Sequence, residues 1–204
     1  MYRLRYSKAS PYVRKVVLAA HYLQLQDEIE FVEADTNNPA DSLRQENPTG
    51  RIPVLLKPDN SAVYDSRVIL DFLERQSQFE LFPQTGDARD VVLTRAALAE
   101  SLIDSAILWV YAARYAGDAQ PPELWRSRQQ DKLQSGLNQL EAEINDWASP
   151  TPNAGALITL TACLGYLSFR QVIAWQEGRP NLVKWYENIA SNLPGFSASA
   201  PGAI

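Results

Sequence analysis

Apolar and polar positions alternate with two different periods along the first third of the chain. Residues 2–6 alternate between a large apolar or aromatic side chain and arginine, and this period of two predicts a β-strand. Apolar residues spaced by three and four then predict a helix from Pro11 to Leu23, with Ser10 as its N-cap. The other elements expected here are strands at 28–33, 52–56 and 62–64, a short helix at 41–45 and a helix that opens at 65–66.

Beyond residue 89 the strand period disappears and long amphipathic stretches take its place. Helices are expected at 89–115, 122–147, 156–176 and 181–191, with breaks at 117–122 and 149–152. A polar segment with Pro83 and Gly86 separates the two patterns. The chain is therefore expected to hold an α/β domain at 1–77, a linker at 78–88 and an all-helical domain at 89–204.

Pro53 lies inside the apolar run at 52–56, where a proline cannot donate a ladder hydrogen bond. Two locations solve this problem. Pro53 either begins an edge strand or follows a cis peptide bond in a tight turn.

Composition excludes several classes of function. The 204 residues include a single cysteine, Cys163, and a single histidine, His21, so a disulfide framework or a Cys-rich zinc site is excluded and no metal is expected. The net charge of −5 argues against nucleic-acid binding. Because no apolar run has the length of a signal peptide or a membrane span, we expect a soluble, cytoplasmic protein.

The start of this acidic chain is nevertheless basic. Five basic residues precede Asp27, the first acidic residue. They form either a solvated face or a corner that receives an anion. The five are Arg3, Arg5, Lys8, Arg14 and Lys15.

Four stretches together carry a family resemblance over essentially the whole chain. They are Ser10–Lys15, Asn47–Leu55, Tyr64–Ile69, and Gly165–Arg170 taken with Arg179–Trp185. In this order and spacing the sequence resembles the cytosolic glutathione S-transferases, in a bacterial form with a serine-type N-terminal motif. The resemblance implies a thioredoxin-like α/β N-terminal domain and an all-α C-terminal domain. It also implies a homodimer, an active site between the two domains and glutathione as co-substrate.

Ser10 is the candidate catalytic residue. At a helix N-terminus the backbone N–H groups and the helix dipole favour negative charge, and a hydroxyl can donate to a thiolate and lower the thiol pKa. The resemblance implies that this sulfur belongs to glutathione. Ser10 can instead be only an N-cap. Tyr6 and Tyr12 are alternative donors, since some related classes use a tyrosine near the first strand.

The resemblance also assigns residues that bind glutathione. Ile52-Pro53 matches the cis-proline turn of the family, where the backbone of Ile52 pairs with an extended peptide. At the helix start, Ser66 and the free N–H groups would hold the γ-glutamyl carboxylate, and Asp65 would accept from its ammonium. The alternative for this pair is an N-cap alone. Arg51 or Lys8 could meet the glycyl carboxylate, although either can simply be solvated.

Tyr12, Tyr111 and Arg114 are the expected lining of a pocket for an apolar electrophile, with helical core packing as the default for the aromatic rings. Cys163 is expected in the core. Asp104 is expected in a buried network or at a neighbouring subunit's glutathione.

One departure from the family pattern concerns a capping box before Gly165. Its two positions here are Ala154 and Leu157, so Asn153 is the expected substitute N-cap.

The leading hypothesis is therefore a glutathione transferase that attacks an electrophilic small molecule. The alternatives are a glutathione-dependent reductase of peroxides or disulfides, an isomerase or dehalogenase on the same fold, and a non-catalytic regulatory or interaction protein.

Overall fold

The computed structural model describes residues 1–116, 121–148 and 153–203. By its internal contacts the chain divides into two compact units. Unit 1 holds Met1–Leu81 together with the C-terminal residues from Leu193 onward, and unit 2 holds Phe82–Asn192. This division differs from the expected one at the C-terminus, because the last residues pack with the first unit and not with the helices that precede them.

Unit 1 is built on a mixed four-stranded sheet with the order β2-β1-β3-β4. Its strands are β1 (Tyr2–Tyr6), β2 (Ile29–Glu33), β3 (Val54–Leu56) and β4 (Ala62–Val63). β1 pairs in parallel with β2 and antiparallel with β3, and β3 pairs antiparallel with β4. The parallel pair of β1 and β2 requires a crossover helix, whereas the antiparallel pair of β3 and β4 needs only a turn. This connectivity gives the expected thioredoxin-like βαβ-ββα arrangement.

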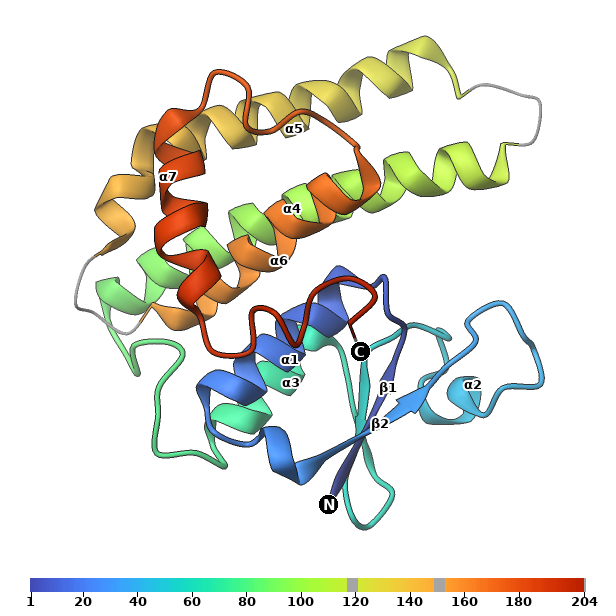
Figure 1. Cartoon of the computed structure of the whole chain (residues 1–204). Helices are drawn as coiled ribbons and strands as arrows, with labels where there is room; N and C mark the ends of the chain where they lie inside the picture. Colours follow the sequence, from blue (N-terminus) through green and yellow to red (C-terminus); the bar gives the residue numbers. More distant parts are fainter. Residues whose placement is uncertain (117–120, 149–152, 204) are drawn as a thin grey trace. The chain divides into compact units, whose positions relative to one another are not determined.

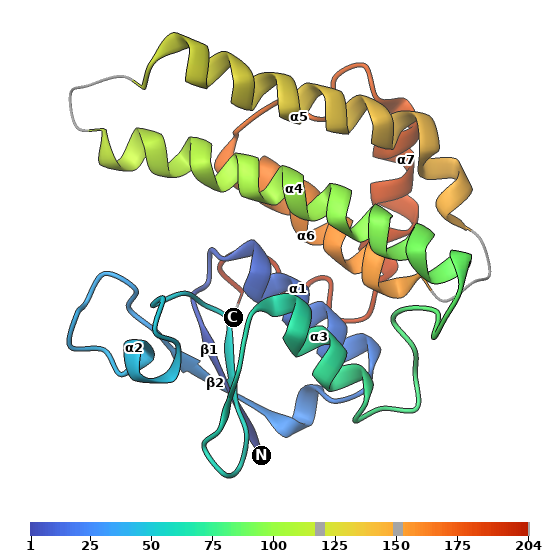
Figure 2. The ribbon, with the colours of Figure 1, turned by 180° about the vertical axis from the view of Figure 1, so that it is seen from behind.

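Helices cover both faces of this sheet. α1 (Pro11–Tyr22) and α3 (Ser66–Glu74) pack together on one side, and the short α2 (Leu43–Glu46) lies on the other, as Figures 1 and 2 show. A 3-10 turn, η1 (Gln26–Glu28), leads into β2. β3 begins two residues later than expected, so Pro53 precedes the strand and is not in it.

The register of β1 against β3 decides which side chains enter each layer. Leu4 pairs with Leu55, and both are fully buried. The neighbouring pair, Arg5 and Val54, points to the opposite face because side chains alternate along a strand. On that face Val54 packs with Leu43 of α2.

The Arg5 guanidinium is therefore buried under α2, where acidic and hydroxyl groups surround it. It donates to Ser42 Oγ at 2.9 Å and to Glu46 Oε1 at 3.0 Å, and it also pairs with the Asp41 carboxylate. A buried charge must be paired to be tolerated. Arg5 thus has a structural role, and the interpretation of the basic start as a solvated face is wrong for this residue.

Unit 2 consists of helices. They are α4 (Asp87–Tyr115), α5 (Glu123–Glu143), α6 (Ala154–Arg170) and α7 (Pro180–Asn188), with the 3-10 turns η2 (Ile144–Ala148) and η3 (Ala190–Asn192). α4 packs along both α5 and α6. α6 is buried along most of its length, and a Cβ on Gly155 in its first turn would lie 2.2 Å from the Phe82 ring.

Unit 2 differs from the expected pattern at the end of α6. The helix expected at 156–176 ends at Arg170, because Gln171 turns into the left-handed region at a φ of 51°. The expected breaks at 117–122 and 149–152 lie mostly outside the described residues. None of the described helices combines the length and the apolar character that crossing a bilayer requires.

Candidate active site

Ser10 caps the amino end of α1. Its backbone is extended, and its Oγ accepts a hydrogen bond from the Val13 N–H at 3.3 Å, which confirms the predicted N-cap. Pro11 follows as the first helical residue, and the first turn carries no acidic side chain. A hydroxyl that accepts through a lone pair keeps its hydrogen for donation. Ser10 can therefore cap the helix and donate to an anion at the same time.

Asp65 caps the amino end of α3. Its Oδ1 accepts from the Arg67 N–H at 3.0 Å, and its Oδ2 pairs with the Arg67 guanidinium at 2.9 Å. The side-chain hydrogen bond from Arg67 does most to hold the pKa of Asp65 below its ordinary value. Ser66, the next residue, is 2% exposed. Asp65 is thus a carboxylate that could accept from an ammonium group.

The Ile52–Pro53 peptide bond is cis, so the second of the two locations foreseen for Pro53 is the observed one. Pro53 is buried and Ile52 half-buried, whereas Arg51 is exposed. The carbonyl oxygen of Arg51 accepts from Asn47 Nδ2 at 2.9 Å. The described side chains around Arg51 do not hold its guanidinium, so it is available to a ligand or to water.

The sheet topology brings these three segments to one edge of unit 1. β1 runs toward Ser10, and its Arg5 pairs with Val54, the first residue of β3. β3 therefore starts where β1 ends. Since β4 is antiparallel to β3, with Val63 opposite Leu55, the chain leaves β4 toward Asp65 at this same edge. The directions of the strands therefore bring the segments that carry the predicted catalytic and glutathione-binding residues to the same edge of the sheet.

Lys15, one of the five basic residues near the start of the chain, also lies in this region. It lies on α1 and is 1% exposed, with its ammonium 6.0 Å from the centre of the Tyr12 ring. Its charge makes a small contribution to lowering the pKa of Asp65. Arg14, beside it, is 4% exposed. The interpretation as a solvated face is therefore wrong for these two residues as well, although Lys8 is exposed.

The alternative donors have other neighbours. The Tyr6 ring meets Phe31 of β2 edge to face, with 5.6 Å between ring centres. Tyr12 is half-buried and belongs to unit 1, whereas the other two residues predicted for the electrophile pocket belong to unit 2.

Tyr111 and Arg114 lie one turn apart on α4. The Arg114 guanidinium is 5.3 Å from the centre of the Tyr111 ring, and Tyr111 is 45% exposed. The default of helical core packing is therefore wrong for Tyr111. Two α6 residues that the sequence did not single out, Tyr166 and Arg170, belong to the same group. Burial raises the pKa of Tyr166, and the charge and hydrogen bond of Arg170 oppose that rise. Tyr166 and Arg170 are four residues apart on a helix that the sequence predicts, and this spacing could have indicated that the two side chains lie on the same helix face.

Three further predictions have mixed outcomes. Cys163 is a free, buried cysteine, as predicted, and burial raises its pKa well above the ordinary value. Asp104 is exposed on α4, so the prediction of a buried network is wrong. Asn153 occupies the N-cap position of α6, but its side chain donates to the carbonyl oxygen of Trp147 and does not cap the helix.

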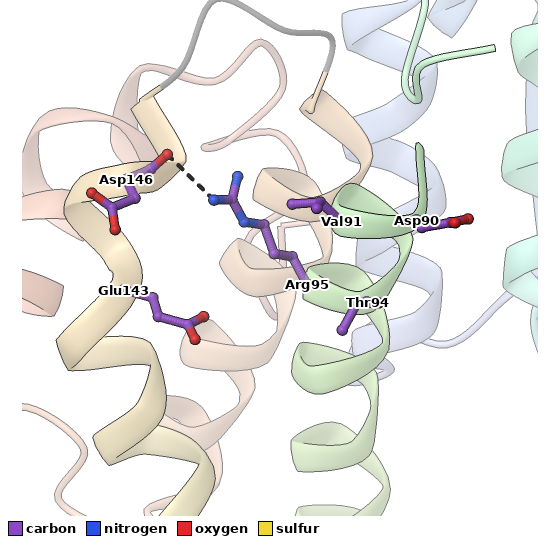
Figure 3. A pocket seen from close by; sticks show the side chains of 6 residues that line it. All are labelled: Asp90, Val91, Thr94, Arg95, Glu143 and Asp146. Carbon is purple, nitrogen blue, oxygen red and sulfur yellow. Dashed lines mark hydrogen bonds between the residues drawn. The ribbon is translucent and has the colours of Figure 1, made fainter. Parts of the chain in front are cut away.

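Unit 2 also contains a cavity of about 460 Å³ between the start of α4 and the region where α5 passes into η2 (Figure 3). Arg95 reaches across it to the carbonyl oxygen of Asp146 at 3.4 Å, and its guanidinium lies 5.3 Å from the centre of the Trp147 ring. No predicted site residue lines this cavity, so its lining gives no support to a glutathione site. The lining residues are Asp90, Val91, Thr94, Arg95, Glu143 and Asp146.

Known proteins resemble the chain both in sequence and in fold. A family model for the N-terminal domain of glutathione S-transferases matches residues 9–76. The uncharacterized GST-like protein YibF of Escherichia coli (strain K12) is 31% identical over 199 residues, which is 96% of each protein. A glutathione transferase family member from Pseudomonas fluorescens Pf-5, with bound glutathione, is 36% identical at a TM-score of 0.91, covering 98% of this chain and 99% of that one. A glutathione S-transferase from Methylobacillus flagellatus KT, also with glutathione bound, is 30% identical at a TM-score of 0.90, covering 98% and 100%.

The chain therefore belongs to the glutathione S-transferase family. This confirms the resemblance and the fold of a thioredoxin-like domain with a helical C-terminal region. The serine-type motif, the individual site residues and the homodimer stay predictions.

Proposed function

We propose that this protein is a glutathione transferase in which Ser10 stabilises the glutathione thiolate for attack on an electrophilic small molecule. The observation that carries the proposal is the Ser10 geometry: a hydroxyl at the amino end of α1 that caps the helix through a lone pair and keeps its hydrogen. The relatives with bound glutathione support the choice of ligand.

The proposed chemistry depends on lowering the pKa of the glutathione thiol when glutathione binds. The positive end of α1 and a hydrogen bond from Ser10 favour the thiolate over the thiol, so the pKa of bound glutathione falls and more nucleophile is present at neutral pH. The protein's own cysteine is buried in α6, so the reacting sulfur comes from the ligand.

The remaining site residues position the tripeptide in this proposal. Asp65 accepts from the γ-glutamyl ammonium, and Ser66 with the first N–H groups of α3 binds its carboxylate. The backbone of Ile52 pairs with the peptide, and Arg51 meets the glycyl carboxylate. Tyr12, Tyr111 and Arg114 contact the electrophile. The homodimer, a cytoplasmic location and a role in detoxification are part of the same proposal.

Conjugation is favoured over reduction because the Pseudomonas fluorescens protein has also been crystallised with S-(propanoic acid)-glutathione, a thioether of glutathione, at 35% identity and a TM-score of 0.87. Glutathione-dependent reduction of peroxides or disulfides is the second candidate.

The test separates capping from activation at Ser10. Ser10→Ala should lower kcat/KM for glutathione conjugation by about 100-fold, the usual cost of one donor to a developing anion. Ser10→Asp keeps a good N-cap but has no hydrogen to donate at neutral pH, so it should fold normally and stay inactive. Ser10→Thr should recover activity. As a matched control, Ser101→Ala removes a hydroxyl on α4 that donates to the Ala97 carbonyl oxygen and should leave turnover unchanged.

Two results would count against the proposal. Unchanged turnover in Ser10→Ala would remove the serine from the mechanism. The absence of calorimetric binding at millimolar glutathione would leave the non-catalytic interaction protein as the better interpretation.

A further inference from the structure

The C-terminal segment of unit 1 runs along α1 in the opposite direction. Three contacts define its course. Gly195 lies at His21 near the end of the helix, Phe196 lies at Arg14, and Gly202 lies at Lys8 before the helix begins. Figure 1 shows this red segment beside α1.

The first two contacts place the segment closely on the helix. Gly195 has a φ of 77°, and a Cβ there would lie 2.4 Å from the His21 imidazole, so only glycine fits both the backbone and the space. The Arg14 guanidinium lies 5.1 Å from the centre of the Phe196 ring. This geometry is a cation–π contact, and it is strengthened because Arg14 is buried.

The third contact reaches the turn that carries Ser10. The Gly202 N–H donates to the carbonyl oxygen of Lys8 at 3.2 Å. Lys8 is in the middle of a turn closed by a hydrogen bond from the Ser10 N–H to the Ser7 carbonyl oxygen at 3.1 Å. Four residues after Ser10, the Arg14 N–H donates to the Ser10 carbonyl oxygen at 3.0 Å. The segment therefore holds the chain on both sides of Ser10.

We propose that the C-terminal segment 193–203 positions the Ser10 hydroxyl, with Phe196 and the Gly202 N–H as its positioning residues. This inference rests on the proposed role of Ser10 as the donor to the thiolate. A hydrogen bond weakens steeply as its length and angle depart from ideal values, so a small displacement of the turn reduces thiolate stabilisation. The glutathione contacts proposed at Ile52, Asp65 and Ser66 lie on other segments of the chain.

A purely structural role predicts a different result, which makes the proposal testable. If the segment only covers α1, its loss lowers stability and leaves the bound thiol as acidic as before. If it positions Ser10, its loss also raises the pKa of bound glutathione. This pKa is measured from the ultraviolet absorbance of the thiolate across a pH titration of the complex. The basic groups around the turn, Lys8, Arg14 and Lys15, are unchanged in every variant below.

Phe196→Ala removes the ring from Arg14. It should raise the pKa of bound glutathione and lower kcat by about tenfold, while the glutathione Kd, measured at an acidic pH where the bound thiol is protonated, changes less than twofold. Phe196→Tyr keeps the ring and should restore both values. Ser197→Ala, at the exposed neighbouring position, should behave as the parent protein.

The Gly202 contact is tested with two truncations. A chain that ends at Pro201 lacks the Gly202 N–H, whereas a chain that ends at Gly202 keeps it. Each truncated chain has a new terminal carboxylate, and the two carboxylates are only one residue apart. The effect of this charge on the thiol pKa should therefore be similar in both chains. Only the shorter chain should show the raised thiol pKa, and equal values in the two chains would contradict the proposed role of this hydrogen bond.

Amide hydrogen exchange at Ser10 separates failure of this inference from failure of the proposed function. Faster exchange in Phe196→Ala, with a raised thiol pKa, supports the inference. Unchanged exchange and an unchanged thiol pKa overturn it. If exchange accelerates but Ser10→Ala itself leaves the thiol pKa unaltered, the segment does hold the turn and the proposed function of Ser10 is what fails.

Discussion

The two units satisfy the amino ends of their helices in different ways. In unit 1 the two longest helices begin with a side-chain cap, Ser10 on α1 and Asp65 on α3. In unit 2, over the residues described, none of the four α-helices is capped by its own N-cap side chain. Local caps are visible in a sequence because the cap and the amide it binds are two or three residues apart.

At α7 in unit 2 a distant residue takes over this role. Both oxygens of the Glu141 carboxylate, on α5, accept from the first amides of α7: Asn181 N–H at 3.0 Å and Leu182 N–H at 2.8 Å. The residue before the helix, Arg179, is buried and donates to Asn138 and Gln134 of α5. The difference between the units also agrees with the proposed function, in which the amino ends of α1 and α3 receive glutathione, whereas Glu141 already occupies the amino end of α7.

The largest expected effect breaks the distant cap. Glu141→Ala leaves two α7 amides without their acceptor and should reduce the free energy of unfolding by about 2 kcal/mol. Glu141→Gln keeps one acceptor oxygen and should cost about half as much. Denaturant unfolding measures both values, and amide exchange at Asn181 and Leu182 locates the change. A loss no larger than that of an ordinary surface substitution would contradict the assigned role.

An intermediate effect is expected at Asp65, where substitutions can separate the proposed binding of glutathione from the capping of α3. Asp65→Ala should weaken glutathione binding by about tenfold, because a charge-assisted hydrogen bond is lost, and should cost about 1 kcal/mol of stability through the lost cap. Asp65→Ser keeps a cap without the charge, so it should restore stability but not affinity. Tyr111→Ala in unit 2 should leave the glutathione Kd unchanged by calorimetry. Equal losses of glutathione affinity in Asp65→Ala and Tyr111→Ala would contradict the proposal that Asp65 binds glutathione and Tyr111 contacts the electrophile.

The smallest expected effect on stability concerns Asp41, whose carboxylate accepts hydrogen bonds from both nearby and distant residues of unit 1. Backbone hydrogen bonds from Asp35 and Leu43, with a further contribution from Arg5, hold the pKa of Asp41 below its ordinary value. The pKa is lower in the folded state than in the unfolded state. The resulting stabilisation is therefore present above the unfolded value of about 4 and is lost as the pH falls through the folded one.

Asp41→Asn should for this reason flatten the loss of stability on the acid side. Denaturant midpoints measured from neutral to acidic pH compare the variant with the parent, and the cost at neutral pH should stay below about 1 kcal/mol. Parallel curves for the two proteins would show that Asp41 contributes nothing to acid sensitivity.

Local patterns predicted much of the candidate site. Ser10 before Pro11 indicated a cap, and the structure shows one. Asp65 before Ser66 indicated a second cap, which is also present. The proline in an apolar run left two possibilities, and pairing between strands decided between them. The burial of Arg5, Arg14 and Lys15 could not be predicted, because each depends on partners or covering segments far along the chain.

The sequence by itself determined most of the elements and the two helix caps, since each depends on residues within one turn or one strand. Only the tertiary structure decided that three segments meet at one edge of the sheet, that Glu141 caps α7, and that the chain from Leu193 returns to α1. The physical reason is that, apart from the pairing of β3 with β4, these contacts join residues 40 or more positions apart, and no local periodicity records them. The basic start illustrates both parts. Its charge was visible at once, but packing alone determined that Arg5 is held under α2 and that Lys15 is buried in α1, where its charge reaches Asp65.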